Sequence, residues 1–271
     1  MLKSSSQPLI KYSLIFIGLM YLGLIVVTPL VNIFYQAFAE GVAGYWSGIT
    51  TPEALHAIGL TLLAVGIAVP LNTVFGIIIA WVIARQNFWG RELLVNLLDL
   101  PLAISPIIAG LMLILLYSHT LGMFGQWLAN MGIKVIFDLP GIVLAITFVT
   151  LPFVTKEVLP ALQAIGKEEE EVARTLGANS WQIFWRITLP NIRWALLYGV
   201  ILCSARALGE FGAVSVVSGK IISQTNTLTL HIERAYAEYQ STAAFACATL
   251  LTFIALITLI AQEILRQTGQ K

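Results

Sequence analysis

The chain has 271 residues, of which 58% are hydrophobic and only 11% are charged, and its mean hydropathy is +0.86. A soluble domain of this composition would lack the polar surface that it needs, so the composition excludes a soluble protein and indicates an integral membrane protein. The formal net charge is +1, and the basic residues do not cluster in a stripe, which argues against a nucleic-acid partner.

Six apolar segments are long enough to cross a bilayer core, which requires about 20 residues per helix. They are predicted to be helices, because every backbone polar group in lipid must be satisfied within its own segment. Pro29, Pro70, Pro101, Pro106 and Pro152 lie inside them and predict kinks or local unwinding. The first segment is too long for a signal peptide and is expected to be a retained helix. The predicted spans are residues 12–38, 55–84, 93–117, 141–159, 194–218 and 241–265.

Lysine and arginine are distributed unevenly between alternate loops. The excess of positive charge on one face predicts that both termini, and the loop of residues 163–193, are cytoplasmic. The predicted cytoplasmic set is Lys3, Lys11, Arg85, Arg91, Lys156, Lys167, Arg174, Arg186, Arg193, Arg266 and Lys271, against Lys134, Lys220 and Arg234 on the opposite face.

The loop between the fourth and fifth predicted spans begins with four consecutive glutamates, at residues 168–171. Val172 and Leu176 are four positions apart, which predicts a short helix over residues 167–176 with one apolar strip and with the glutamates facing away from it. Gly177 is expected to end this helix in the left-handed conformation that glycine adopts at helix C-termini.

A second helix is predicted to begin at the Asn179/Ser180 cap and to end at residues 188–190, because residues before a proline are pushed out of the helical region. Its tryptophans and arginines would also suit an amphipathic helix anchored at lipid headgroups. That alternative does not explain the acidic first half, which an anionic inner leaflet would repel. We therefore favour a docking site for a cytoplasmic protein.

The same loop resembles the EAA loop of binding-protein-dependent ABC importer permeases, written E-A-A-x3-G-x9-I-x-L-P. All spacings fit, and the one departure is Val172 in place of alanine. The resemblance implies an all-α membrane protein with six transmembrane helices and the type I ABC importer permease fold, in which this loop is the coupling helix that docks on an ATPase subunit. The residues to which it assigns ATPase coupling are Glu171, Val172, Ala173, Gly177, Ile187, Leu189 and Pro190.

Residues 96–110, 148–162 and 188–219 are similar to the sulfate/thiosulfate permease pair, and to its W subunit more than its T subunit, particularly through GEFGAVSVVSG at 209–219. Molybdate permeases share part of this pattern, so a molybdate or tungstate permease subunit remains an alternative. The resemblance, which covers residues 12–265, implies one permease domain over the whole chain, 1–271, with its core at about 55–265. It also implies a prokaryotic inner membrane location and a complex with a related permease, two ATPases and an external sulfate-binding protein.

The phosphate-binding pattern G-x-x-x-x-G-K-[ST] does not occur, because the glycine–lysine pairs at 166–167 and 219–220 lack its other residues. We therefore expect no enzyme activity and no cofactor in this chain, with ATP used by the partner ATPases. His56, His119 and His231 are scattered along the sequence, so no metal site is expected.

Arg206 and Glu210 are four positions apart in the fifth predicted span, where they are expected to lie one above the other on a helix face near the bilayer midplane. Such charges must face protein or a water-filled path. Either they form a structural pair, with each other or with the partner permease, or Arg206 offers a positive site to an oxyanion and Glu210 keeps its affinity low. Asp99, just before Pro101, is expected to make a helix-end polar contact, with a pathway role as the alternative.

The sequence thus predicts a permease subunit of an ATP-driven sulfate importer, with thiosulfate as a further substrate. A secondary anion carrier would require an inverted repeat and more intramembrane carboxylates than Asp99 and Glu210, and no convincing repeat is seen. A membrane-embedded enzyme would require a cluster of reactive residues, which the sequence does not contain.

Overall fold

The computed structural model describes residues 7–120 and 122–269, and these contain helices and no strands, so the predicted all-α fold is confirmed. Lys3 and Lys271, which were assigned to the cytoplasmic face, lie outside the described residues. The elements are α1 (Gln7–Leu22), the π-helical turn η1 (Gly23–Val27), α2 (Thr28–Ala37), α3 (Gly41–Thr50), α4 (Pro52–Arg85), α5 (Arg91–Leu97), α6 (Leu100–Ala103), α7 (Pro106–Tyr117), α8 (Gly125–Asn130), α9 (Leu139–Ile165), α10 (Glu168–Thr175), α11 (Ser180–Ile183), the π-helical turn η2 (Phe184–Thr188), α12 (Leu189–Leu208), α13 (Gly212–Val217), α14 (Leu228–Ala237) and α15 (Ser241–Gly269).

The chain divides into two compact units. The first comprises residues 1–51 and 232–250, and the second comprises residues 52–231 and 251–271. In the first unit, α3 packs closely on the start of α15: a side chain at Gly48 would come within 2.8 Å of the Cα atom of Ala243. A side-chain hydrogen bond of 3.0 Å between Tyr45 and Thr249 joins the same two helices.

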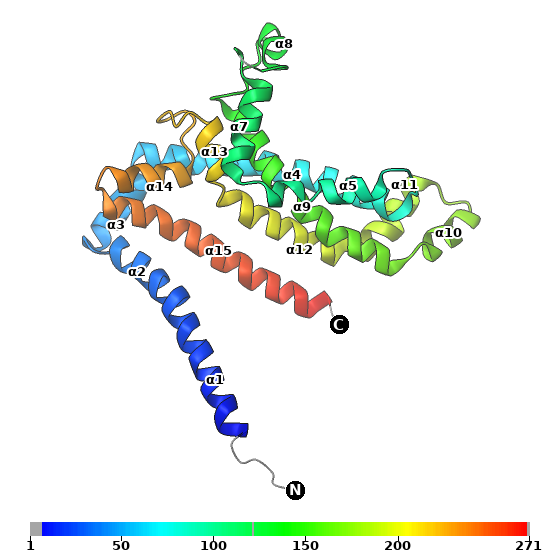
Figure 1. The fold of residues 1–271 in the computed structure, drawn as a ribbon, viewed down its shortest axis with the longest axis horizontal. Coiled ribbons are helices and arrows are strands. Elements are labelled where there is room, and N and C mark those ends of the chain that lie inside the picture. Colours follow the sequence, from blue (N-terminus) through cyan, green and yellow to red (C-terminus); the bar gives the residue numbers. More distant parts are fainter. Residues whose placement is uncertain (1–6, 121, 270–271) are drawn as a thin grey trace. The chain divides into compact units, whose positions relative to one another are not determined.

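The core of the second unit is a bundle of α4, α9 and α12, which run side by side (Figure 1). Gly76 of α4 and Gly199 of α12 both lie against Val154 of α9, and small residues at these positions let the helix backbones approach closely. Buried polar contacts also cross the bundle: the Asn72 amide donates to the Thr150 hydroxyl at 2.7 Å, and the Cys203 thiol donates to the Thr150 carbonyl at 3.8 Å. This bundle supports the elements that carry the predicted site residues.

The third predicted span is not one continuous helix. Helices α5 and α6 together and helix α7 pass the length and hydropathy test as a pair, but the chain bends by 109° between them. Ile104 and Ser105 are extended there, with ψ near 135°, because Pro106 disfavours the helical conformation in the residue before it. The described residues therefore contain five continuous helices that could span a membrane, or six spans if the bent pair is one of them.

The other prolines have mixed effects. The π-helical turn η1 directly precedes Thr28 and Pro29, as the prediction of local unwinding requires. In contrast, α4 continues through Pro70 and α9 continues through Pro152 without interruption. Pro152 is buried against neighbouring helices, which sustain the helix there despite the missing backbone hydrogen bond, whereas Pro70 is exposed within its unit.

Candidate functional site

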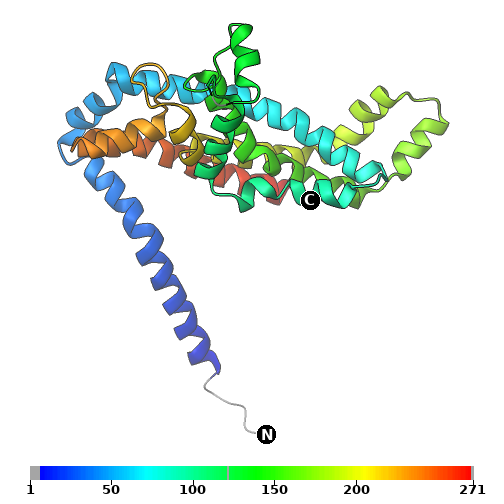
Figure 2. The ribbon, with the colours of Figure 1, turned by 45° about the horizontal axis from the view of Figure 1, so that its top comes forward.

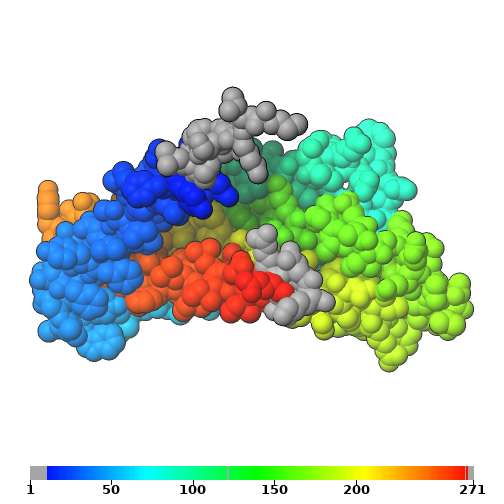
Figure 3. Space-filling model, turned by 90° about the horizontal axis from the view of Figure 1, so that it is seen from below, coloured from blue at the N-terminus to red at the C-terminus, as the bar shows by residue number. Residues whose placement is uncertain are grey.

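Helices α10 and α11 form a short hairpin that extends from the end of the α4–α9–α12 bundle (Figures 1 and 2). Helix α10 begins at Glu168 and ends at Thr175, close to the predicted bounds. In the space-filling view, the yellow-green residues of this hairpin lie at the surface of their unit (Figure 3). The hairpin therefore carries the first half of the predicted coupling motif, from Glu171 to Gly177, on an accessible projection.

The turn between the two helices has the expected glycine cap. Gly177 has a φ of +87°, and no atom lies within 4 Å of the position that a side chain there would occupy. The amide of Ala178 donates to the carbonyl of Ala173, and the amide of Gly177 donates to that of Arg174, both at 3.0 Å, which is the Schellman pattern. The constraint at Gly177 is thus its backbone conformation and not the available space.

The start of α11 is capped as predicted. The Asn179 side chain accepts from the backbone amide of Gln182 at 2.8 Å, and the Gln182 side chain accepts from the amide of Asn179 at 3.0 Å. This reciprocal capping box satisfies two backbone donors at the helix N-terminus. Together with the glycine cap, it defines the turn between α10 and α11 through local hydrogen bonds.

The predicted end of the second helix at residues 188–190 is wrong. The chain stays helical through η2 into α12, and the Leu189 amide donates to the carbonyl of Phe184, five residues earlier. The wider π turn opens the hydrogen-bond ladder just before Pro190, which has no amide proton to donate, so the helix continues. The fifth predicted span therefore begins with Ser180 and ends at Leu208, and 194–218 is not its range.

The predicted coupling residues divide into two groups. Glu171, Val172 and Gly177 are exposed, and Val172 lies in one apolar strip with Leu176, which is outside the predicted set; these two side chains are 58% and 82% exposed. Ala173 is half-buried behind this strip, as is Ile187 in η2. Leu189 packs against the bundle core, and Pro190 is exposed at the start of α12. The first half of the motif thus faces outward, while its second half joins the hairpin to the bundle.

Glu170 is the residue that the sequence analysis missed, because all four glutamates were expected to face solvent. Its carboxylate is buried and ion-paired with Arg85, with 2.9 Å between Oε1 and Nη2. It also accepts a hydrogen bond from the Thr188 hydroxyl at 3.0 Å. No local signal in the sequence distinguishes Glu170 from its neighbours, because its partner Arg85 lies 85 positions away in the chain.

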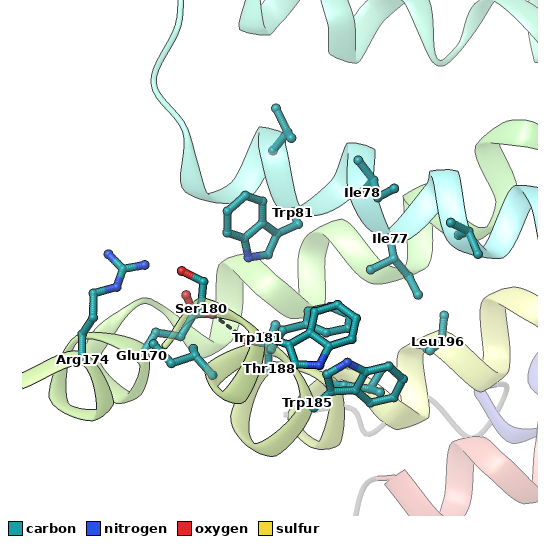
Figure 4. A pocket seen from close by; sticks show the side chains of 15 residues that line it. Ile77, Ile78, Trp81, Glu170, Arg174, Ser180, Trp181, Trp185, Thr188 and Leu196 are labelled. Carbon is teal, nitrogen blue, oxygen red and sulfur yellow. Dashed lines mark hydrogen bonds between the residues drawn. The ribbon is translucent and has the colours of Figure 1, made fainter. Parts of the chain in front are cut away.

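A cavity of about 770 Å³ lies between α4 and the hairpin (Figure 4). Trp81 comes from α4, Trp181 from α11 and Trp185 from η2, and the dashed line in the figure is the bond between Thr188 and Glu170. Apart from that polar edge, the walls of the cavity are almost wholly apolar. Tryptophan is enriched at the membrane–water interface, so this lining is consistent with a cavity at that depth.

The two predicted pathway charges are paired, but not on one helix face as expected. Helix α12 ends at Leu208, so Arg206 lies in its last turn and Glu210 lies beyond it. The Glu210 side chain is fully buried, and its Oε1 accepts from the backbone amide of Ala213 at the start of α13. Gly209 and Gly212 lie on either side of Glu210 at this break. Glycine destabilises a helix interior, because it loses more conformational freedom on folding than other residues, so the helix is easily interrupted here.

Asp99 is the residue just before α6, and its carboxylate lies 2.5 Å from Nζ of Lys156 on α9. The expected polar contact at a helix end is therefore present, as an ion pair between two half-exposed side chains. The α6 segment is thereby tied to α9 beside the 109° bend. The three histidines form no candidate metal cluster with other ligand types among the residues that the structure describes.

The sequence matches the family described as "Binding-protein-dependent transport system inner membrane component" over residues 72–268. It is 52% identical over 258 residues to the sulfate transport system permease protein CysW of Synechocystis. The aligned region covers 95% of this chain and 93% of that protein. It is 40% identical over 242 residues to the permease protein CysT of Escherichia coli, covering 89% and 87%.

Among solved structures, a bacterial ABC transporter that imports the polysaccharide alginate superposes with a TM-score of 0.78, covering 99% of this chain and 97% of that chain. The identity is 18%, so this likeness concerns the fold. The fold is that of the type I ABC importer permeases, and the family match shows a permease subunit of this class, which is not itself catalytic. The chain belongs to the family of binding-protein-dependent transport system inner membrane components, and it resembles CysW more than CysT.

Proposed function

We propose that this chain forms, together with a related permease, the membrane pathway through which an ATP-driven importer takes up sulfate, with thiosulfate as a further substrate. The observation that carries the choice of substrate is the 52% identity to a sulfate permease over 95% of the chain. The similarity to CysT supports a pair of related permeases. In this proposal the whole chain, 1–271, is one permease domain, and both termini are cytoplasmic.

The α10–α11 hairpin docks on an ATPase subunit, which hydrolyses ATP and supplies the driving force, while this chain binds no cofactor. The exposed Val172 and Leu176 provide an apolar contact of the kind that a cleft on another protein would bury. Glu171 provides a charge beside it, so the contact has an orientation. An external sulfate-binding protein delivers the anion at the opposite face.

Arg206 attracts the anion within the pathway, and Glu210 holds Arg206 in place and limits its affinity. The Arg206 side chain is 34% exposed and the Glu210 side chain 0%, so the cation is the accessible member of the pair. A partly exposed guanidinium is well suited to bind a tetrahedral oxyanion with two hydrogen bonds. Asp99, which is paired with Lys156, contributes to the conformation of the α6–α7 bend.

Substrate competition in a bacterial host without its own sulfate permeases tests the choice of anion. The host would express this chain with its partner permease, ATPase and binding protein, and uptake of radiolabelled sulfate would be measured. We expect excess unlabelled sulfate or thiosulfate to suppress uptake strongly, and molybdate or tungstate to suppress it weakly. Stronger suppression by molybdate than by sulfate itself would favour a molybdate or tungstate permease instead.

A further inference from the structure

We propose that Arg85 and Glu170 form the mechanical link by which a displacement of α10 reaches the ends of α4 and α9. Glu170 is then a positioning residue of the hairpin, distinct from Glu171, which the EAA pattern selects. This inference rests on the proposed role of the hairpin as an ATPase docking site, and it assigns the step that follows docking.

The guanidinium of Arg85 connects three helices. Its Nε donates to both carboxylate oxygens of Glu170, at 3.1 and 3.2 Å, and its Nη2 donates to Oε1 at 2.9 Å. Its Nη1 donates to the backbone carbonyl of Leu162 in α9, also at 2.9 Å. Arg85 is the last residue of α4, so one side chain ties the ends of α4 and α9 to α10.

A second set of contacts extends the link toward α12. The Thr188 hydroxyl donates to Glu170 from η2, which continues into α12. The Lys167 ammonium donates to the backbone carbonyl of Arg85 at 2.9 Å, and the Asn191 amide donates to Glu169 at 2.6 Å. The base of the hairpin is therefore bonded directly to α4 and α12, and through Arg85 to α9, while its tip at Leu176 is 82% exposed.

Burial makes this link difficult to break. The side chains of Arg85 and Glu170 are only 6% and 10% exposed, and separating a buried pair leaves two uncompensated charges in a poorly hydrated site. When a force displaces the tip, movement of the attached helix ends is favoured over rupture of the pair. A contiguous network of bonded groups and rigid elements of this kind can carry coupling between distant sites.

Charge removal at Glu170 tests the link, with Glu168 as the matched control in the same acidic run. Glu170→Gln keeps the side-chain volume and an oxygen for Thr188 but removes the charge, whereas Glu168 is exposed. In the reconstituted full complex, we expect Glu170→Gln to retain subunit stoichiometry and ATP hydrolysis but to import about tenfold less sulfate per ATP. Glu168→Gln should behave as wild type. A wild-type ratio of sulfate to ATP in Glu170→Gln overturns the proposal.

Arg85→Lys is the second variant, because lysine keeps the charge but cannot hold both carboxylate oxygens and the Leu162 carbonyl together. We expect it also to lower the ratio of imported sulfate to hydrolysed ATP. Full rescue by lysine would show that charge alone matters and would overturn the proposed link between helices. If either variant fails to assemble, the spectroscopic measurement below still decides, because it needs only the solubilised permease chain.

Spin labels at Leu176→Cys and Trp89→Cys, both in the second unit and 82% and 99% exposed, report the position of the hairpin. Cys203 and Cys247 would be replaced by alanine so that only the two labels react. The proposal predicts a narrow distance distribution in the wild-type background and a clearly broader one in Glu170→Gln. An unchanged distribution contradicts it, whether or not the hairpin docks on an ATPase. Docking itself is scored separately, by cross-linking from position 176 to the ATPase.

Discussion

Nη1 of Arg206 lies 2.7 Å from Oε2 of Glu210, although the helix that carries Arg206 ends at Leu208. The pair therefore bridges a helix break and is not a contact between successive turns. The surrounding backbone fixes Glu210, since its side chain accepts from the amide of Ala213 and its carbonyl accepts from the Thr229 hydroxyl. The guanidinium of Arg206 is paired with Glu210 through Nη1, and its side chain remains 34% exposed, so part of the guanidinium is accessible.

Replacing Arg206 by methionine alone would leave Glu210 buried and unpaired, at a cost of about 3–5 kcal/mol in stability. The double variant Arg206→Met/Glu210→Gln removes both charges at similar volume and keeps an oxygen for the Ala213 amide. We expect this complex to assemble and to keep ATPase stimulation by the loaded binding protein, but to import radiolabelled sulfate poorly. Near-normal import would leave a purely structural ion pair as the better account.

Gly177→Val should lower transport strongly. A β-branched residue at a φ of +87° is strained by roughly 1–2 kcal/mol, and relief of that strain would redirect the hairpin. Gly177→Asn is the matched control, because asparagine tolerates the left-handed conformation. Uptake by the two variants, normalised to the amount of chain in the membrane, measures the difference. Normal assembly and transport in Gly177→Val would refute the role of this backbone conformation.

Charge reversal should distinguish Glu171 from Glu168, which are both exposed. Glu171→Lys places a positive charge in the predicted contact with the ATPase, and we expect it to release the ATPase subunits or to uncouple hydrolysis from uptake. Glu168→Lys should do much less. The ATPase retained on the purified permease and the sulfate imported per ATP are the two measurements. Equal effects at both positions would mean that bulk charge, and not docking geometry, is what the hairpin contributes.

The close approach of α7 and α13 predicts an unusual response to alanine. A Cβ atom at Gly110 would lie 2.8 Å from the carbonyl oxygen of Ala213, a backbone atom that cannot yield easily. Gly110→Ala should therefore destabilise the solubilised protein by about 1–3 kcal/mol. At Gly66 on α4 a Cβ atom meets nothing within 4 Å, so Gly66→Ala should be neutral or stabilise by up to about 1 kcal/mol. Similar thermal unfolding midpoints for the two variants would contradict the observed packing.

The sequence predicted the helical class, most spans and both caps of the hairpin, because hydropathy, glycine and asparagine act locally. It failed where tertiary contacts decide. The bend between α6 and α7 and the helix break after Leu208 interrupt segments whose apolar character is continuous. Proline usually ends a helix, but the helix continues past Pro190, because the π turn before it accommodates one extra residue per turn.

Glu170 shows the same limit within the candidate site. Four identical residues in a row give no local signal for which one is turned inward, because the partner Arg85 is 85 positions away in the chain. The EAA pattern directs attention to Glu171, and only the packing of α10 on the end of α4 distinguishes its neighbour. Motif residues that face solvent could thus be predicted, whereas the residue that anchors them could not.

The most direct measurement is sulfate accumulation in proteoliposomes that contain this chain, its partner permease and the ATPases, with the sulfate-binding protein supplied on the side opposite the ATPases. We expect radiolabelled sulfate to accumulate only when both ATP and the binding protein are present, and accumulation to be unchanged when ionophores collapse the ion gradients. Accumulation without ATP, driven by an imposed ion gradient, would contradict this expectation and would indicate a secondary anion carrier.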